Sequence, residues 1–192
     1  MSSASREAKL AAYATLIRKW NPAINLVAAA TLPNLETRHL ADSSQLATLA
    51  PPSGSWLDIG SGGGLPGIVV AIHNPDRTVT LVDSDQRKVA FLQTAIRDLR
   101  LENCTAIAGR IEAIPPASAR HVSARALAPL DRLMPYVARH MTEDGTAWLM
   151  KGRNWQAEVD AARKHWRFDI TAHASATDPS AAILQISGLH RG

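Results

Sequence analysis

The sequence predicts an α/β fold: a doubly wound, mostly parallel seven-stranded sheet with a small N-terminal helical extension. Two observations lead to this prediction. From residue 55 onward, short strand-like segments alternate with longer segments of helical periodicity, which is typical of parallel strands joined by covering helices. A glycine-rich segment directly follows the first of these strands, at the edge where such sheets bind ligands.

The chain is expected to form one domain over residues 1–192, with residues 1–50 as the helical extension and residues 54–192 as the α/β core. A length of 192 residues is enough for one core and short for two. Residues 6–20 show apolar side chains at helical spacing, and Asn21-Pro22 is expected to end that helix, because proline disfavours helix in the residue before it. A second helical stretch is expected from about Leu32 to Leu49.

Within the core, strands and helices are expected in turn. The expected strands are Ser55–Ile59, Thr78–Val82, Cys104–Ala108, His121–Arg125, Thr146–Met150, Phe168–His173 and Ala181–Ser187. The expected helices are Pro66–His73, Gln86–Leu99, Leu130–Arg139 and Asn154–Trp166. Only Ala174–Ser180 separates the last two strands, which predicts a closing antiparallel hairpin.

Composition and charge exclude several classes of protein. No apolar run approaches the roughly 20 residues of a membrane helix, and the first residues lack the apolar centre of a signal peptide. The single cysteine, Cys104, excludes an internal disulfide and a multi-cysteine zinc site. We therefore expect a cytoplasmic protein with no membrane association and no metal, and we take a monomer as its state, although the sequence does not determine the oligomeric state. A net charge of +4 permits a polyanionic partner without requiring one.

The glycine-rich segment runs from Asp58 to Gly67 and has the pattern Asp-x-Gly-x-Gly-x-Gly, with Gly60, Gly62 and Gly64 as its glycines. Glycine lets the backbone turn sharply and lets a ligand approach it closely. The same segment contains a formal Gly-x-Gly-x-x-Gly from Gly62 to Gly67, which is a dinucleotide-binding pattern. An NAD-binding oxidoreductase is therefore one interpretation.

The acid before the glycines favours S-adenosylmethionine as the cofactor. A carboxylate at Asp58 can hold the cationic amino-acid end of that cofactor, whereas it would repel a pyrophosphate. The chain also has little room for a nicotinamide-substrate domain. The Tyr-x-x-x-Lys pair of short-chain dehydrogenases is missing, since His140 follows Tyr136 at that spacing and Ile17 follows Tyr13. We interpret the segment as the cofactor loop of a methyltransferase.

Two later segments are placed to complete the cofactor site. Asp83 closes the second strand, where an acid can accept hydrogen bonds from ribose hydroxyls; the other interpretation is a helix cap. Ile111 and Glu112 follow the third strand, where an adenine would lie, although an ordinary loop is the alternative.

At this point the sequence resembles the RsmG (GidB) family of bacterial 16S ribosomal RNA methyltransferases, which have the Rossmann-like class I fold and methylate N7 of a guanine near the decoding site. The matching stretches extend from about residue 19 to 152. They are Lys19-Trp20-Asn21 with Asn25-Leu26, Arg38-His39-Leu40-Ala41-Asp42-Ser43, Asp58 to Gly67, Leu81-Val82-Asp83-Ser84, Lys88 to Leu92, Arg110-Ile111-Glu112, Ser123-Ala124-Arg125-Ala126 and Lys151-Gly152.

The resemblance implies S-adenosylmethionine as cofactor and 16S rRNA or the small ribosomal subunit as partner. It implies cofactor contacts at positions matching those of the family: Gly60, Leu65, Ile111, Glu112 and Arg125. It places Arg125 beside the transferable methyl group, and Arg38, His39 and Lys151 on a basic active-site rim. The alternatives are a salt bridge for Arg125 and a structural histidine at position 39. Trp20 is expected to be buried rather than to stack on a base.

This sequence departs from the family at several places. Gly63 stands where relatives often have Ala or Pro, and Leu127 where many have a larger apolar or aromatic residue. Arg120-His121 replaces the usual Phe-Asp, and the N-terminal extension is shorter than in many relatives. These departures affect the rigidity of the loop and the expected substrate contacts.

Guanine N7 carries a lone pair and no proton, so its methylation needs no general base, and alignment of the reacting atoms should supply most of the rate. The sequence shows no nucleophile–base pair, and Cys104 is expected to be a buried structural thiol. Three other functions remain open at this stage: methylation of another acceptor, an NAD-dependent oxidoreductase, and an RNA-binding module without catalysis.

Overall fold

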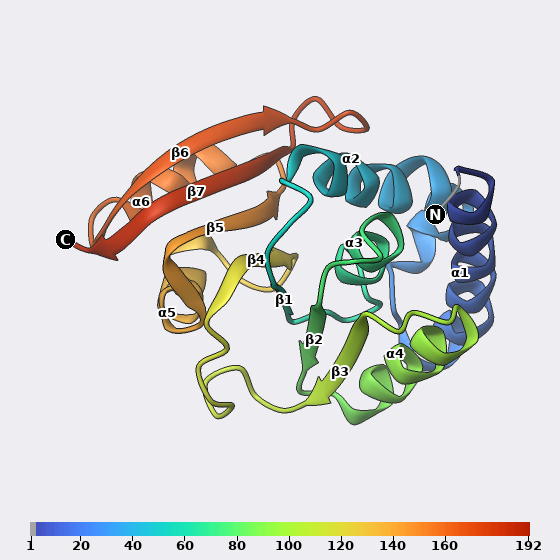
Figure 1. The fold of residues 1–192 in the computed structure, drawn as a ribbon. Helices are drawn as coiled ribbons and strands as arrows, with labels where there is room; N and C mark the ends of the chain where they lie inside the picture. Colours follow the sequence, from blue (N-terminus) through green and yellow to red (C-terminus); the bar gives the residue numbers. More distant parts are fainter. Residues whose placement is uncertain (1–2) are drawn as a thin grey trace.

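The computed structural model describes residues 3–192 and contains one seven-stranded sheet in the order β3-β2-β1-β4-β5-β7-β6 (Figure 1). The first five strands in this order run parallel, and β7 lies antiparallel between β5 and β6. The predicted doubly wound sheet and its closing hairpin are therefore confirmed. The strands are β1 Trp56–Ile59, β2 Val79–Asp83, β3 Cys104–Ala108, β4 Ala119–Arg125, β5 Met141–Lys151, β6 Trp166–Ala174 and β7 Ala182–Arg191.

Helices cover both faces of the sheet, as Figure 1 shows. They are α1 Ser3–Ile24, the 3-10 helix η1 Ala29–Asn34, the π-helix η2 Leu35–Leu40, α2 Ala41–Leu49, α3 Gly67–His73, α4 Gln86–Asp98, α5 Leu130–His140 and α6 Trp155–Ala162. Helices α1 to α4 share one apolar cluster with one face of the sheet, and α5 and α6 share a second cluster with the other face. Successive side chains of β1 point to opposite faces of the sheet, so Trp56 lies in the first cluster and Leu57 in the second.

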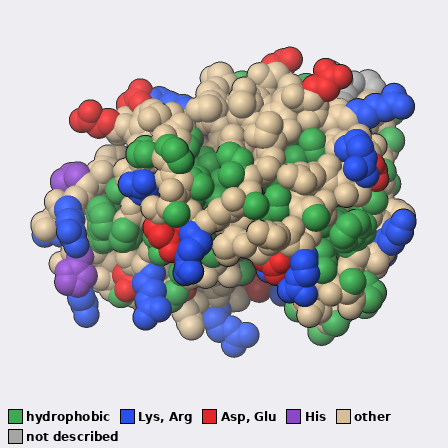
Figure 2. Space-filling model, turned by 90° about the horizontal axis from the view of Figure 1, so that it is seen from below, with side chains coloured by type: hydrophobic (Ala, Val, Ile, Leu, Met, Phe, Trp, Pro, Cys, Tyr) green, Lys and Arg blue, Asp and Glu red, His purple; other side chains and the backbone are tan. Residues whose placement is uncertain are grey.

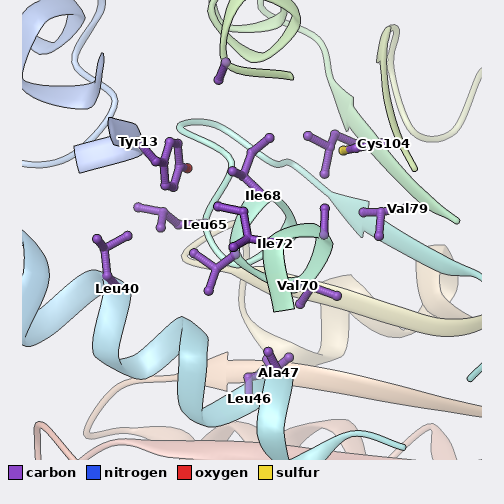
Figure 3. Packing of buried hydrophobic residues seen from close by; sticks show 14 of the residues in the cluster. Tyr13, Leu40, Leu46, Ala47, Leu65, Ile68, Val70, Ile72, Val79 and Cys104 are labelled. Atoms are coloured by element: carbon purple, nitrogen blue, oxygen red, sulfur yellow. The ribbon is translucent and has the colours of Figure 1, made fainter. Parts of the chain in front are cut away.

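The N-terminal helices belong to the same core as the sheet. Figure 3 shows Tyr13 of α1 and Leu40 and Ala47 of the second helical stretch arranged around α3. Tyr13, Ile17 and Leu46 are fully buried, and Trp20 packs edge-on against Phe91 of α4 with ring centroids 5.7 Å apart. Trp20 is only partly buried, so the expectation of core burial holds in part: one side of its ring packs against this cluster. The N-terminal extension thus closes the face of the sheet on which α3 lies.

The predicted end of the first helix at Asn21-Pro22 is wrong, because α1 continues to Ile24 with Pro22 inside it. The cause is a tertiary contact of the residue before the proline. Asn21 is buried, its Oδ1 accepts a hydrogen bond from the Val27 backbone N–H at 2.8 Å, and its carbonyl accepts one from Asn25 N–H at 3.0 Å. These bonds hold Asn21 in a helical conformation that the proline alone disfavours.

Several late elements have bounds different from those predicted, among them β4, which begins at Ala119 instead of His121. The strand β5 begins at Met141 instead of Thr146, since Met141 pairs with Ala119 of β4 before a register shift. The helix α6 ends at Ala162 rather than at Trp166, because Trp166 already pairs with Arg191 of β7 and opens β6. The strand β7 likewise extends beyond the predicted Ser187, to Arg191. Cys104 is buried at the start of β3, as expected.

Candidate functional site

Two adjoining cavities open at the carboxyl ends of the parallel strands, where doubly wound sheets bind ligands. The first, of about 480 Å³, lies over the ends of β1, β2 and β3, and we call it the cofactor cavity. The second, of about 670 Å³, lies over the ends of β4 and β5, and we call it the acceptor cavity. Both volumes fall within the usual range for small-molecule sites. The two cavities share the wall residues Leu26, Arg125, Ala126 and Leu127.

The glycine loop forms the floor of the cofactor cavity with an unusual backbone. Gly60, Gly62 and Gly64 have φ angles of +64°, +55° and +80°, which side chains rarely adopt. A Cβ at Gly60 would lie 2.5 Å from Leu127 Cδ1, whereas one at Gly62 would meet nothing closer than 3.8 Å. The loop therefore presents bare backbone to the cavity at Gly60 and Gly62, which suits close contact with a ligand.

Tyr13 of α1 fastens this loop from behind. Its ring is fully buried, and its hydroxyl donates a short hydrogen bond to the Gly63 carbonyl. Burial raises the pKa of the Tyr13 hydroxyl well above its ordinary value, so the proton that makes this bond stays in place. Our sequence reasoning placed Tyr13 only on an apolar helix face, because the fifty residues between the partners leave no local signal of the bond.

Asp58 lies beneath the loop and not in the wall of the cofactor cavity. It is 1% exposed, and its Oδ1 accepts a hydrogen bond from Ser123 Oγ at 2.5 Å. Its Oδ2 has no hydrogen-bond partner among the described residues and would lie 2.8 Å from a Cβ at Gly67. Burial raises the pKa of Asp58 to about 6, while the Ser123 hydroxyl opposes that rise. Direct contact between Asp58 and the amino-acid end of a cofactor stays a prediction.

Most of the other predicted cofactor residues line the cofactor cavity: Gly60, Gly62, Leu65, Asp83, Ile111, Glu112 and Arg125. Gly64 is absent from this wall, because it packs in the core against Tyr13, Ile68 and Leu92. Asp83 accepts hydrogen bonds from the Gly62 N–H at 2.7 Å and the Asp85 N–H at 2.9 Å. Each carboxylate oxygen has a second acceptor site, so these bonds leave room for ribose hydroxyls.

One end of the cofactor cavity is lined by the loop after β3. Glu112 is bound there by Arg110, with Nε and Oε1 3.0 Å apart. The carbonyl of Ile111 accepts a hydrogen bond from His140 Nε2 at 2.9 Å, which holds the Ile111 side of the loop against α5. Asp85, rather than Ser84, caps α4 by accepting from the Arg87 N–H at 2.9 Å. Asp83 is therefore not the cap of this helix.

Side chains along β4 point alternately to the two faces of the sheet, and this places Arg125 at the boundary between the cavities. Val122 and Ala124 enter the core on the α5 side, while His121, Ser123 and Arg125 lie on the opposite face. His121, one of the departures from the family, is buried between Trp56 and Trp148 and accepts a hydrogen bond from Trp148 Nε1 at 3.2 Å. The polar residues of this strand are thus all partnered, and Arg125 is the one that reaches a cavity.

Arg125 is joined to His39 of η2. Its Nη1 donates to His39 Nδ1 at 2.9 Å, and His39 Nε2 lies 2.7 Å from Thr31 Oγ1. Arginine can only donate, so Nδ1 of His39 is the acceptor and its proton lies on Nε2. Burial, with the nearby charges of Arg125 and Arg38, lowers the pKa of His39 to about 4. His39 is therefore neutral near pH 7 and orients Arg125 rather than adding charge.

The other two predicted rim residues also line the acceptor cavity, but in different states. Lys151 has a side chain only 8% exposed, and its Nζ donates to the Ala128 carbonyl at 2.6 Å and to Glu158 Oε2 at 2.9 Å. Arg38 is exposed and forms no hydrogen bond or ion pair with residues 3–192. Besides Arg125, the acceptor cavity thus has one fixed cation, Lys151, and one that is free to meet an incoming ligand, Arg38.

The face seen in Figure 2 carries basic side chains dispersed among acidic and apolar ones, without one continuous patch of a single sign. Within residues 3–192, no three His, Cys, Asp or Glu side chains come together as a metal-binding group. None of the helices formed by these residues combines the length and the hydropathy needed to cross a bilayer.

Comparison with known proteins identifies the family that this chain resembles. The family model described as rRNA small subunit methyltransferase G matches residues 6–185. The chain is 60% identical to the ribosomal RNA small subunit methyltransferase G of Paracoccus denitrificans, over 97% of this chain and 98% of that protein. It is 48% identical to the protein of the same name from a Ruegeria species, over 95% and 91%. A SAM-dependent methyltransferase from Aquifex aeolicus has the same fold, with a TM-score of 0.63, 11% identity and coverage of 83% and 98%. The chain belongs to the rRNA small subunit methyltransferase G family.

Proposed function

We propose that this chain transfers the methyl group of S-adenosylmethionine to N7 of a guanine in bacterial 16S rRNA near the decoding site. Family membership carries the reaction class and the small-subunit rRNA. The single structural observation that supports the reaction most strongly is the shared wall of the two cavities. Because Arg125, Ala126, Leu127 and Leu26 line both, a cofactor on one side can meet an acceptor on the other.

The cofactor cavity fits S-adenosylmethionine by the geometry of its floor. The missing side chains at Gly60 and Gly62 leave backbone that a Cβ would cover or strain. Asp83 would hold the ribose hydroxyls, Ile111 would pack on the adenine and Glu112 would stand beside it. Gly60, Leu65 and Arg125 would line the amino-acid end, with Asp58 supporting the loop from below. When bound, the cofactor supplies a methyl group on a positively charged sulfur.

The acceptor cavity would receive a guanine taken out of its stack in the RNA, as enzymes acting on bases require. Arg125 would orient the base or its phosphate, with its own direction fixed by His39. Arg38 and Lys151 would supply further donors to phosphate or guanine O6. No residue is needed to remove a proton, since N7 has none. The residues therefore act by alignment and by excluding water.

Purified protein, labelled S-adenosylmethionine and small subunits lacking the modification provide the direct test. We expect label in 16S rRNA, located at guanine N7 by mass spectrometry, and no label with Arg125→Ala. A protein that binds the cofactor but labels neither free 16S rRNA nor the subunit would contradict the substrate and favour another acceptor. Binding of NADH in a fluorescence titration, without affinity for S-adenosylmethionine, would favour an oxidoreductase.

We further propose that the working unit is a single chain, folded as one domain and acting in the cytoplasm. Both cavities are lined by residues of one chain, and the N-terminal helices share a core with the sheet. Sedimentation of the active protein at the mass of one chain would agree with this. An active dimer with an inactive monomer would contradict it.

A further inference from the structure

A set of hydrogen bonds joins α2 to the end of β6 and the loop that follows it, residues 175–181, across 129 to 135 positions of sequence. Asp42 Oδ1 accepts from Ser175 Oγ at 2.8 Å and from Thr177 Oγ1 at 2.7 Å. Gln45 Nε2 donates to the Ala174 carbonyl at 2.7 Å, and its Oε1 accepts from the Ala176 N–H at 2.9 Å. Asp42 and Gln45 are three residues apart, so both face this loop from one side of the helix.

The shape of the loop depends on the same contact. Ser175 Oγ donates its proton to Asp42 and accepts from the backbone N–H groups of Thr177 and Asp178, each at 3.1 Å. One hydroxyl thus links the carboxylate of Asp42 to two backbone groups of the turn. If Asp42 no longer accepts, the Ser175 hydroxyl loses the partner that orients it, and the turn is less constrained.

The loop is also a wall of the acceptor cavity. Ser175, Asp178 and Ala181 line it opposite the predicted rim residues Arg38, His39 and Lys151. Asp42 itself lines the cavity, whereas Gln45 and Thr177 do not. Two of the tethering side chains can therefore be changed without altering the surface that an RNA would contact.

We propose that Asp42 is a positioning residue for the RNA substrate, acting by holding the β6–β7 loop as a preformed wall of the acceptor cavity. This inference rests on the proposed function. A loop that must be ordered when RNA binds adds an entropic cost to binding, which raises the KM for RNA. Asp42 forms no hydrogen bond with Arg125 or His39 and does not line the cofactor cavity, so kcat should be retained once the RNA is bound. The charge of Asp42 also acts on Arg125 and His39, and the variants at Gln45 and Thr177 test the tether without changing that charge.

The test measures methylation of small subunits lacking the modification, with RNA concentration and cofactor concentration varied separately. Asp42→Ala is expected to raise the KM for the subunit about tenfold or more, since bonds to a charged acceptor are lost. Its kcat and its affinity for S-adenosylmethionine should stay near those of the unsubstituted protein. Asp42→Asn should restore a low KM, because the amide oxygen can accept from both hydroxyls.

Gln45→Ala and Thr177→Val are the matched variants, because each removes part of the tether outside the cavity wall. Both should raise the KM in the same direction by a smaller factor. In all three weakened variants, hydrogen exchange at the Thr177 and Asp178 amides should be faster. These two mild changes keep the test valid if Asp42→Ala does not fold.

Three results would overturn the inference. One is an unchanged KM in Asp42→Ala and Gln45→Ala. The second is a decrease in kcat as large as the increase in KM, or a loss of cofactor affinity, in these variants. The third is a KM in Asp42→Asn as high as in Asp42→Ala while Gln45→Ala behaves as the unsubstituted protein, which would mean that the charge of Asp42 acts on the RNA directly. Failure of the proposed function is distinct, because the unsubstituted protein would then label no small-subunit rRNA.

Discussion

Arg125 and His39, from β4 and the π-helix η2, form one hydrogen-bonded unit at the boundary of the two cavities, with Nη1 and Nδ1 2.9 Å apart. The imidazole accepts, and its other nitrogen lies against Thr31 Oγ1. The role of His39 is therefore to set the direction of the guanidinium. A side chain that offers an acceptor at the position of Nδ1 should serve in its place.

Replacing His39 with Asn and with Ala separates orientation from packing. We expect His39→Ala to lower kcat for rRNA methylation by about 10- to 100-fold, the size of a lost hydrogen bond to a charged group. His39→Asn should lose less, because its amide oxygen can accept from Arg125. Steady-state kinetics on small subunits measures both, with calorimetry of cofactor binding as the control. Equal losses in the two variants would show that the acceptor does not matter.

Acidification should destabilise the protein below about pH 6.5, where the unfolded chain protonates its histidines. Burial, followed by nearby positive charge, lowers the pKa values of His39 and His121 to about 4 in the fold. Between pH 6.5 and 4 the unfolded state therefore binds more protons at these two sites. The free energy of unfolding decreases as the pH decreases over this range. Asp58 opposes this, since its pKa is raised from 3.8 to about 6 and its contribution to stability is lost as pH rises.

Urea unfolding at several pH values checks the balance. The midpoint should fall between pH 7 and pH 5, and Asp58→Asn should make that fall steeper because the opposing group is gone. The individual sites can be followed by NMR of the imidazole protons. A His39 signal that titrates near 6.5, or a midpoint independent of pH over this range, would refute the prediction.

Tyr13→Phe should make the glycine loop less constrained, because it removes the hydrogen bond to the Gly63 carbonyl. The change leaves the buried Gly63 carbonyl without its donor, which costs about 1–3 kcal/mol of unfolding free energy. Affinity for S-adenosylmethionine should fall as well, because the loop is less constrained. Tyr136→Phe is the matched control for stability, since the Tyr136 hydroxyl has no hydrogen bond within the described chain and should change the unfolding free energy less. A Tyr13→Phe variant as stable as this control would contradict a stabilising hydrogen bond between Tyr13 and Gly63.

Gly62→Ala and Gly64→Ala should differ although both residues have positive φ. Each substitution incurs the cost of a left-handed residue, about 1–2 kcal/mol. At Gly64 the new Cβ would also lie 2.5 Å from Ile68 and 2.9 Å from Leu92, which adds about 1–3 kcal/mol of overpacking. Thermal unfolding should therefore rank Gly64→Ala as the less stable. Gly62→Ala should instead affect mainly cofactor affinity, measured by calorimetry. A Gly62→Ala variant less stable than Gly64→Ala would contradict the prediction.

The predictability of this structure follows the range of the interactions. Strand alternation and the glycine loop are local patterns, so the sheet, its hairpin and the floor of the cofactor cavity followed from the sequence. The end of α1 did not, because Asn21 is held helical by Val27, a contact that the rule for prolines ignores. Tyr13 and the Asp42 tether were missed for the same reason, since their partners lie 50 and 133 positions away. Arg125 was singled out by resemblance, and its bond to His39 became visible only in three dimensions.

The residues that line the two cavities lie in different parts of the chain, so the two cavities are completed at different times during synthesis. Every wall of the cofactor cavity lies between Leu26 and Tyr136, whereas the acceptor cavity needs Ser175 through Ile183. A chain emerging from a ribosome therefore carries all residues of the first cavity well before it carries those of the second. The strand translated last and the loop before it are the segments that complete the acceptor cavity.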